Sequence, residues 1–216
     1  AIYELRTGSN VNAVKVAEPA SFSADDIVVL YMPKGWHIIT KGDEENLGKA
    51  SDRVPHRNVG AYSINRIDTI QNDTIVFVAP TPFKDSLKPG EMAQLVKVPE
   101  YKNARVTGTI HGEEWSESSG KGGVIALYVE GTLKLEADID ASGIGFEGAD
   151  PGGDDYSGGC YQDDPALYGE AFYLSGQDHL AGLKGEGAVV STFNDSIRGR
   201  KPLFNGGGGG NGKFAG

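Results

Sequence analysis

Glycine is concentrated in the C-terminal third of this 216-residue chain, and this distribution restricts what each part can fold into. Of the 32 glycines, 20 lie at or after Ala141. Glycine loses more backbone entropy on ordering than any other residue, so regular helices and strands avoid it. Residues 150–160 and 205–212 are therefore either flexible linkers or packed polyproline-II-type strands, in which only glycine tolerates close backbone approach on every side.

Short strands dominate the part of the chain that precedes Ala141. Residues 27–32 form a continuous, β-branched run that is typical of a strand buried on both faces. Residues 67–70 and 74–78 flank a three-residue loop and predict a β-hairpin. Residues 94–98 alternate between apolar and polar side chains and stop at a proline, which cannot donate to a sheet.

A second hairpin is predicted further along the chain, after another short strand at 105–110. Residues 123–129 and 132–140 flank a Glu-Gly pair, and the second run alternates apolar and charged side chains. Leu133, Leu135, Ala137 and Ile139 would share one face of it.

The fold class that follows is all-β. No stretch before Ala141 keeps an apolar helical period over three turns, so helix should be scarce. We expect a β-sandwich-like domain over residues 1–140. A β-solenoid is the alternative, because residues 123–133 could form successive rungs. The glycine-rich region 141–216 should be polyproline-II-like or irregular, and we expect it to continue beyond these residues.

The charge balance excludes several classes of partner. The net charge is −10, whereas nucleic-acid binding depends on basic surfaces that neutralise phosphates. Anionic membranes are disfavoured for the same reason, and no run of about twenty apolar residues predicts membrane insertion. A start at Ala-Ile-Tyr fits a mature exported protein, and the lone Cys160 offers no internal disulfide.

Motifs that would indicate catalysis are weak. Residues 143–148 match G-x-G-x-x-G, but Ala-Asp-Pro-Gly-Gly follows and cannot begin the helix that a dinucleotide site needs. The four histidines lack metal-site spacing, and there is no G-x-S-x-G motif. We therefore predict that the chain is not an enzyme and holds no cofactor, apart from the calcium ion considered next.

An acidic cluster in the glycine-rich region could hold a structural calcium ion, although solvated surface carboxylates are the favoured interpretation. Closely spaced carboxylates in a loop suit this hard, oxygen-seeking cation, but the spacing matches no known calcium loop. The candidate ligands are Asp150, Asp154, Asp155, Asp163 and Asp164.

The pattern Asp, hydroxyl residue, aliphatic residue recurs four times, whereas the composition predicts about 0.6 by chance. It resembles the O-glycosylation sequon of Bacteroidota, and strand starts that favour Asp-Thr-Ile are the alternative explanation. The candidate glycosylation sites are Thr69, Thr74, Ser86 and Ser196.

Aromatic residues on a flat sheet face would indicate glycan binding, although core packing is the commoner role of tryptophan. The candidates are Trp36, Trp115, Tyr156, Tyr161 and Tyr168.

In collinear order over about residues 25–216, the chain resembles the N-terminal regions of large Bacteroidota (Flavobacteria-type) cell-surface, adhesin-like proteins. The most specific match is residues 122–146, GGVIALYVEGTLKLEADIDASGIGF. Shorter matches lie at 26–32, 58–62, 94–101, 104–109, 184–187 and 205–211. The insert at 150–170 is longer and more acidic than the family pattern.

That resemblance implies export by the type 9 secretion system, whose machinery would be a partner, and an extracellular location at the cell surface. It implies a non-catalytic structural or adhesive module involved in surface adhesion or gliding-associated display. Two alternatives stay open. One is a self-assembling extracellular fibre subunit that binds copies of itself, and the other is a glycan-binding module of a secreted hydrolase that binds surface polysaccharide.

Overall fold

The computed structural model describes residues 2–6, 11–38, 59–81, 83, 87, 90–148 and 186–191. The chain divides into two compact units, one comprising residues 1–35 and 57–145 and the other residues 36–56 and 146–216. Most residues after 148 lie outside the described part, so the predicted boundary at residue 140 stays a prediction.

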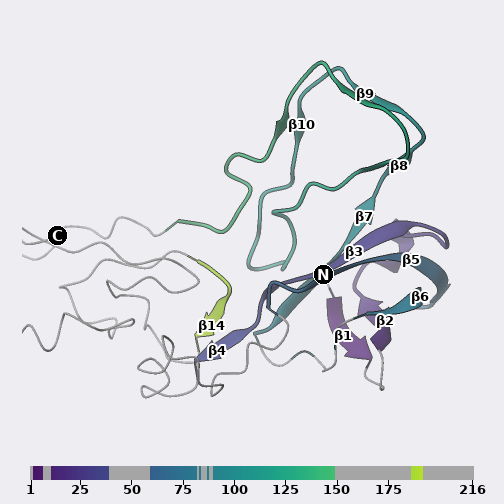
Figure 1. Cartoon of the computed structure of the whole chain (residues 1–216). Coiled ribbons are helices and arrows are strands. Elements are labelled where there is room, and N and C mark those ends of the chain that lie inside the picture. Colours follow the sequence, from purple (N-terminus) through teal and green to yellow (C-terminus); the bar gives the residue numbers. More distant parts are fainter. Residues whose placement is uncertain are drawn as a thin grey trace, which may run out of the picture. The chain divides into compact units, whose positions relative to one another are not determined.

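Six antiparallel strands form a closed barrel in the first unit (Figure 1). They are β1 (Ile2–Arg6), β2 (Val11–Val16), β3 (Ile27–Lys34), β5 (Tyr62–Gln71), β6 (Thr74–Thr81) and β7 (Met92–Val98). Their order around the barrel is β1-β2-β6-β5-β3-β7, and the pair Ile2–Ala93 closes the ring between β1 and β7. The spatial order β7-β3-β5-β6 is a Greek key, because three sequential strands are followed by a fourth that returns beside the first.

Alternate residues of these strands fill the barrel interior. Val28, Leu30 and Met32 of β3 are at most 1% exposed, and they pack with Ile75 and Phe77 of β6 in one cluster. Because side chains alternate along a strand, the residues between them point outward. The only helix of the described residues is a three-residue 3-10 turn, η1 (Pro19–Ser21).

The outer wall of the barrel is unusually apolar where β5, β3 and β7 run side by side. The register places outward residues in three cross-strand rows. These rows are Arg66–Ile27–Val98, Ile64–Val29–Val96 and Tyr62–Tyr31–Gln94. An apolar outer face needs a covering layer, and the next part of the chain supplies one.

Residues 100–140 form three short parallel strand pairs, which we call the ladder. The first coil contains β8 (Glu100–Tyr101), β9 (Ala104–Val106) and β10 (Ile110–His111), and the second contains β11 (Tyr128–Val129), β12 (Leu133–Leu135) and β13 (Ile139–Asp140). Paired residues are 28 positions apart at β8–β11 and 29 apart at the other two pairs. The chain therefore makes two stacked turns of a solenoid, which leave the barrel at the end of β7 (Figure 1).

The all-β prediction is confirmed. The first sheet curls into a barrel instead of packing against a second sheet as in the expected sandwich. Residues 100–140 form a solenoid, the predicted alternative, but its coils pair 28 or 29 residues apart, so residues 123–133 do not form successive rungs. The hairpin of β5 and β6 is confirmed, with Gln71 opposite Thr74 and Asn72 at a φ of 56° in the turn.

The second predicted hairpin is wrong. β11, β12 and β13 each pair in parallel with a strand of the first coil rather than with one another. Alternation indicates only that one face of a strand is more apolar, so it could not distinguish a nearby antiparallel partner from a distant parallel one in the preceding coil.

In the second unit, β4 (Trp36–Ile38) pairs in parallel with β14 (Val189–Ser191). The Glu186 N–H also donates to the carbonyl of Glu147, at 2.8 Å. Among the described residues, no helix is long and apolar enough to cross a membrane.

Candidate functional site

An apolar cleft of about 640 Å³ lies between the outer wall of the barrel and the ladder. Ile27, Val29 and Ile64 form its barrel side, together with Val98. Its other side comes from residues 123 and 125–128, which lead into the second coil, and from residues 139, 141, 144 and 145. The cleft is thus the part of the apolar wall that the ladder leaves uncovered. We call it the wall cleft.

The loop between the two coils holds the ladder against the barrel. The side-chain amide of Gln94, 3% exposed on β7, bonds both backbone groups of Gly122: its Nε2 donates to the Gly122 carbonyl at 2.9 Å, and its Oε1 accepts from the Gly122 N–H at 3.2 Å. Two ion pairs flank this contact, Lys121 Nζ to Glu18 Oε1 at 3.0 Å and the buried Lys34 to Glu117. We call the Gln94–Gly122 contact the amide clamp.

Replacing Gln94 with alanine should lower the free energy of unfolding by about 1–3 kcal/mol, because two buried backbone groups of Gly122 lose their partner. Gln71→Ala, at an exposed position of β5, is the matched control and should change little. Urea unfolding of the three proteins measures the difference. Equal stability of the two variants would show that water replaces the amide clamp without cost.

A bidentate ion pair attaches the first coil beside the wall cleft. Arg66 Nη1 and Nη2 lie 3.2 and 3.3 Å from the two carboxylate oxygens of Glu100, and Nη1 also donates to the carbonyl of Asp25 at 2.6 Å. Arg66 shares the outward face of β5 with Ile64, and Glu100 is the register partner of Tyr128. The polar pair is therefore next to the apolar lining of the cleft.

One exposed tyrosine lines the wall cleft, and a second lies beyond it on the same face of β5. Tyr128 lines the wall cleft and is 46% exposed. Tyr62 is 64% exposed and precedes Ile64 by two residues on the same face of β5, roughly 7 Å along the strand. Tyr101 is also exposed, but it follows Glu100 in β8 and so faces the opposite side of the ladder.

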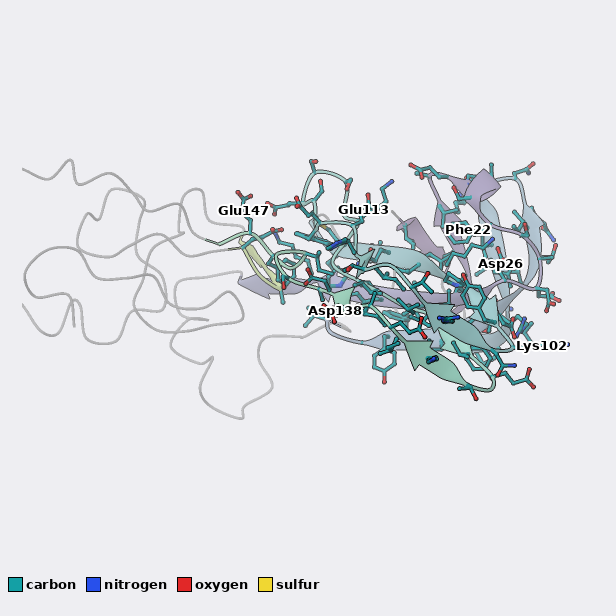
Figure 2. The ribbon with its side chains drawn as sticks, turned by 90° about the horizontal axis from the view of Figure 1, so that it is seen from above. Phe22, Asp26, Lys102, Glu113, Asp138 and Glu147 are labelled. Carbon is teal, nitrogen blue, oxygen red and sulfur yellow. The ribbon has the colours of Figure 1, made fainter. Side chains whose placement is uncertain are left out.

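The outer side of the ladder carries complementary charges on its two coils. Arg105 Nε donates to Glu136 Oε2 at 2.6 Å, and Lys134 Nζ lies 2.7 Å from Glu136 Oε1. The hydrogen bond from Lys134, followed by that from Arg105, lowers the pKa of Glu136. Figure 2 shows Lys102 and Asp138 toward opposite ends of the ladder.

A second carboxylate of the ladder lies at the end of β13. Hydrogen bonds from Ser142 lower the pKa of Asp140. The Asp140 carboxylate also lies 3.6 Å from the ring of His111, its register partner in the first coil. Each of these two carboxylates of the second coil therefore interacts with a side chain of the first coil.

Acid should loosen the ladder. Because the folded-state pKa values of Glu136 and Asp140 are depressed, their contribution is complete above the unfolded values of about 4 and is lost as the pH falls through the lower folded values. Hydrogen exchange of residues 128–140, corrected for intrinsic rates, should therefore accelerate below about pH 4. Glu136→Gln should reduce that dependence, and an unchanged profile in this variant would contradict the prediction.

Few of the sequence-predicted site residues lie in the described part. Thr69 is half-buried in β5, whereas Thr74 is 7% exposed and its hydroxyl donates to Asp73 Oδ1 at 3.1 Å. Modification of Thr74 would have to precede closure of the barrel, and glycosylation at both sites stays a prediction. Ser86, Ser196, Tyr156, Tyr161, Tyr168 and the five candidate calcium ligands Asp150, Asp154, Asp155, Asp163 and Asp164 lie outside the described residues.

The predicted tryptophans do not form the site. Trp115 is half-buried in the loop after the first coil, where its backbone N–H donates to the Ile144 carbonyl at 2.9 Å, and the side chain of Trp36 is outside the described part. Sequence reasoning missed Tyr62, Arg66, Glu100 and Tyr128. The alternation of Tyr62, Ile64 and Arg66 along β5 could have indicated that these residues share one face of the strand. The contact of this strand with β8, through Arg66 and Glu100, depends on tertiary packing.

Neither a family model nor a curated protein matches the chain. Among solved structures, it is similar to the gp54 tailspike of Acinetobacter baumannii bacteriophage AP22, in complex with A. baumannii capsular saccharide, at a TM-score of 0.29 and 10% identity. It is also similar to the tailspike protein gp49 from Pseudomonas phage LKA1, at a TM-score of 0.29 and 13% identity. The matches cover 62% and 63% of this chain and 20% of each tailspike chain. Likeness at this level carries no argument about function.

Proposed function

We propose that this chain is a non-catalytic structural and adhesive module of a large extracellular, cell-surface protein. One observation carries the proposal: a closed barrel holds two in-register parallel coils through the amide clamp and the Arg66–Glu100 pair. A solenoid coil contacts only its neighbours and needs a protected end. A barrel attached to the first coils supplies a rigid base for a stacked, extended structure.

The surface location is tested on the organism that encodes the chain. An antibody against residues 1–216 should label intact cells, and external protease should remove the label. Label that appears only after the cells are opened would overturn the location. Export through type 9 secretion machinery and O-glycosylation at Thr69, Thr74, Ser86 or Ser196 belong to the same proposal, and glycopeptide mapping of native protein tests them.

The adhesive role needs a separate measurement. Cells that lack the chain should attach less to surfaces, or glide less, and the intact gene should restore the behaviour. Normal attachment and gliding in the deletion strain would argue against this role even for a surface-located protein.

A second candidate function, a self-assembling fibre subunit, rests on the second coil. Leu133, Leu135 and Ile139 are 38%, 54% and 36% exposed, and within the described residues the strands that carry them pair only with the first coil. An unpaired strand edge beside exposed aliphatic side chains is a template for association. Sedimentation velocity over a hundredfold concentration range should then show growing species that Leu135→Lys abolishes, and a concentration-independent monomer would remove this candidate.

A further inference from the structure

The wall cleft has an apolar lining that includes the exposed Tyr128, and the exposed Tyr62 and the bidentate Arg66–Glu100 pair lie next to residues of that lining. Ligand sites are typically concave and mostly apolar, with a few convergent polar groups, and have volumes of roughly 300–1,000 Å³. The wall cleft has a volume of about 640 Å³ and an apolar lining, and the polar Arg66–Glu100 pair lies beside that lining rather than within it. Tyr128 lies at its ladder side, and Tyr62 and Arg66 flank Ile64 on its barrel side.

We propose that the wall cleft binds an uncharged oligosaccharide, whose rings stack on Tyr128 and Tyr62 and whose hydroxyls bond to the Arg66–Glu100 pair. This inference rests on the proposed adhesive function and names its ligand class.

The side chains match the chemistry of a sugar. A pyranose ring has an apolar C–H face and a rim of hydroxyls. A protein site that binds it therefore needs a flat apolar surface beside planar hydrogen-bonding groups. Tyrosine provides a rigid apolar ring with a polar tip. Arg66 and Glu100 already hold each other in a planar, bidentate geometry, and they are only partly buried, at 37% and 46% side-chain exposure. They can therefore meet hydroxyls without first being ordered.

Charge argues for a neutral saccharide rather than an anionic one. Arg66 is compensated by Glu100 and by Asp25, whose Oδ1 lies 3.4 Å from Nη1. The chain as a whole carries a net charge of −10. A uronic-acid or sulfated polymer would approach like charge, which opposes binding.

The wall of the cleft also argues against a peptide strand as the ligand. A peptide that extends a sheet needs a free strand edge. β3 is paired on both sides, by β5 and β7, and β5 is paired by β3 and β6. β3 and β5 therefore offer the cleft a sheet face and no backbone edge.

Gly145 provides a variant that should block the cleft without straining the fold. It lines the cleft, a Cβ there would meet no atom within 4 Å, and its φ is outside the positive range. Gly145→Phe should therefore fill the site. Gly108, on the ladder between β9 and β10, has the same open surroundings and does not line the cleft, so Gly108→Phe is the matched control.

The experiment is affinity electrophoresis of the full 216-residue chain in native gels. The gels contain soluble neutral polysaccharides (a β-1,3-glucan, a β-1,4-mannan or dextran), and alginate serves as the polyanion. At least one neutral polymer should retard the chain, and alginate should not. Tyr128→Ala and Gly145→Phe should weaken the retardation about tenfold or more, whereas Tyr128→Phe, Tyr101→Ala and Gly108→Phe should retain it.

Each other outcome overturns the inference. Absence of retardation by all three neutral polymers removes the ligand class, and retardation by alginate alone reverses the charge argument. Retardation that persists in both Tyr128→Ala and Gly145→Phe would show that the binding site lies outside the wall cleft. Circular dichroism of each variant establishes that it is folded. Surface labelling of cells is independent of these gels, so a surface-located chain without saccharide binding would refute this inference and leave the proposed location intact.

Discussion

Gly122→Ala is expected to lower the free energy of unfolding by about 3–5 kcal/mol and to release the ladder from the barrel. A Cβ at this position would lie 2.1 Å from the carbonyl oxygen of Glu114, and the backbone φ of 100° is one that alanine rarely adopts. The steric clash and the backbone strain both arise at Gly122, the residue that the amide clamp holds. Urea unfolding measures the loss, and saccharide retardation should disappear together with the wall cleft.

Substitutions at two other glycines distinguish the steric cause of that loss from the backbone conformational cause. Gly60 has a φ of 77° but open surroundings, so Gly60→Ala should cost only about 1 kcal/mol of backbone strain. Gly108 has open surroundings and no positive φ, so Gly108→Ala should be nearly neutral or slightly stabilising. A loss at Gly122 no larger than that at Gly60 would mean that the loop moves aside easily and that the contact with Glu114 is not a constraint.

Leu30→Ala should lower the free energy of unfolding by about 2–5 kcal/mol, because it removes a fully buried side chain from the centre of the barrel. Leu30 belongs to the cluster that contains Val28, Met32 and Phe77, so the cavity would be surrounded by side chains from several strands. Unlike Gly122→Ala, this variant should destabilise barrel and ladder together, since the ladder rests on the outer wall of β3. Hydrogen exchange resolved by segment distinguishes the two patterns.

Val78→Ala is the matched control for the barrel core. Val78 lies on β6 but is 66% exposed, so shortening it removes little buried area and should change stability by less than about 0.5 kcal/mol. A loss at Leu30 equal to the loss at Val78 would contradict the closed barrel as the stabilising core of the first unit.

The sequence predicted individual strands better than their partners. The run at 27–32 is the core strand β3, and the strands at 67–70 and 74–78 pair as a hairpin because only a short turn separates them. The second hairpin was wrongly predicted from the alternation that includes Leu133, Leu135 and Ile139. An alternating strand can pair equally well with an antiparallel neighbour or with a parallel strand of another coil. The paired strands of the two coils differ in sequence, so the repeat was not visible as a repeat.

The sequence by itself determined the all-β class, the near absence of helix in the described residues and the position of four of the six barrel strands, because these depend on local alternation and on the scarcity of helical periodicity. It did not predict the other two, β1 and β2. Tertiary structure alone decided the closure of the barrel, the parallel stacking of the coils and the wall cleft. Arg66 on β5, Glu100 on β8 and Tyr128 on β11 come together only when these distant segments of the chain pack across the barrel wall. Such a contact depends on register and on the amide clamp, which no local pattern encodes.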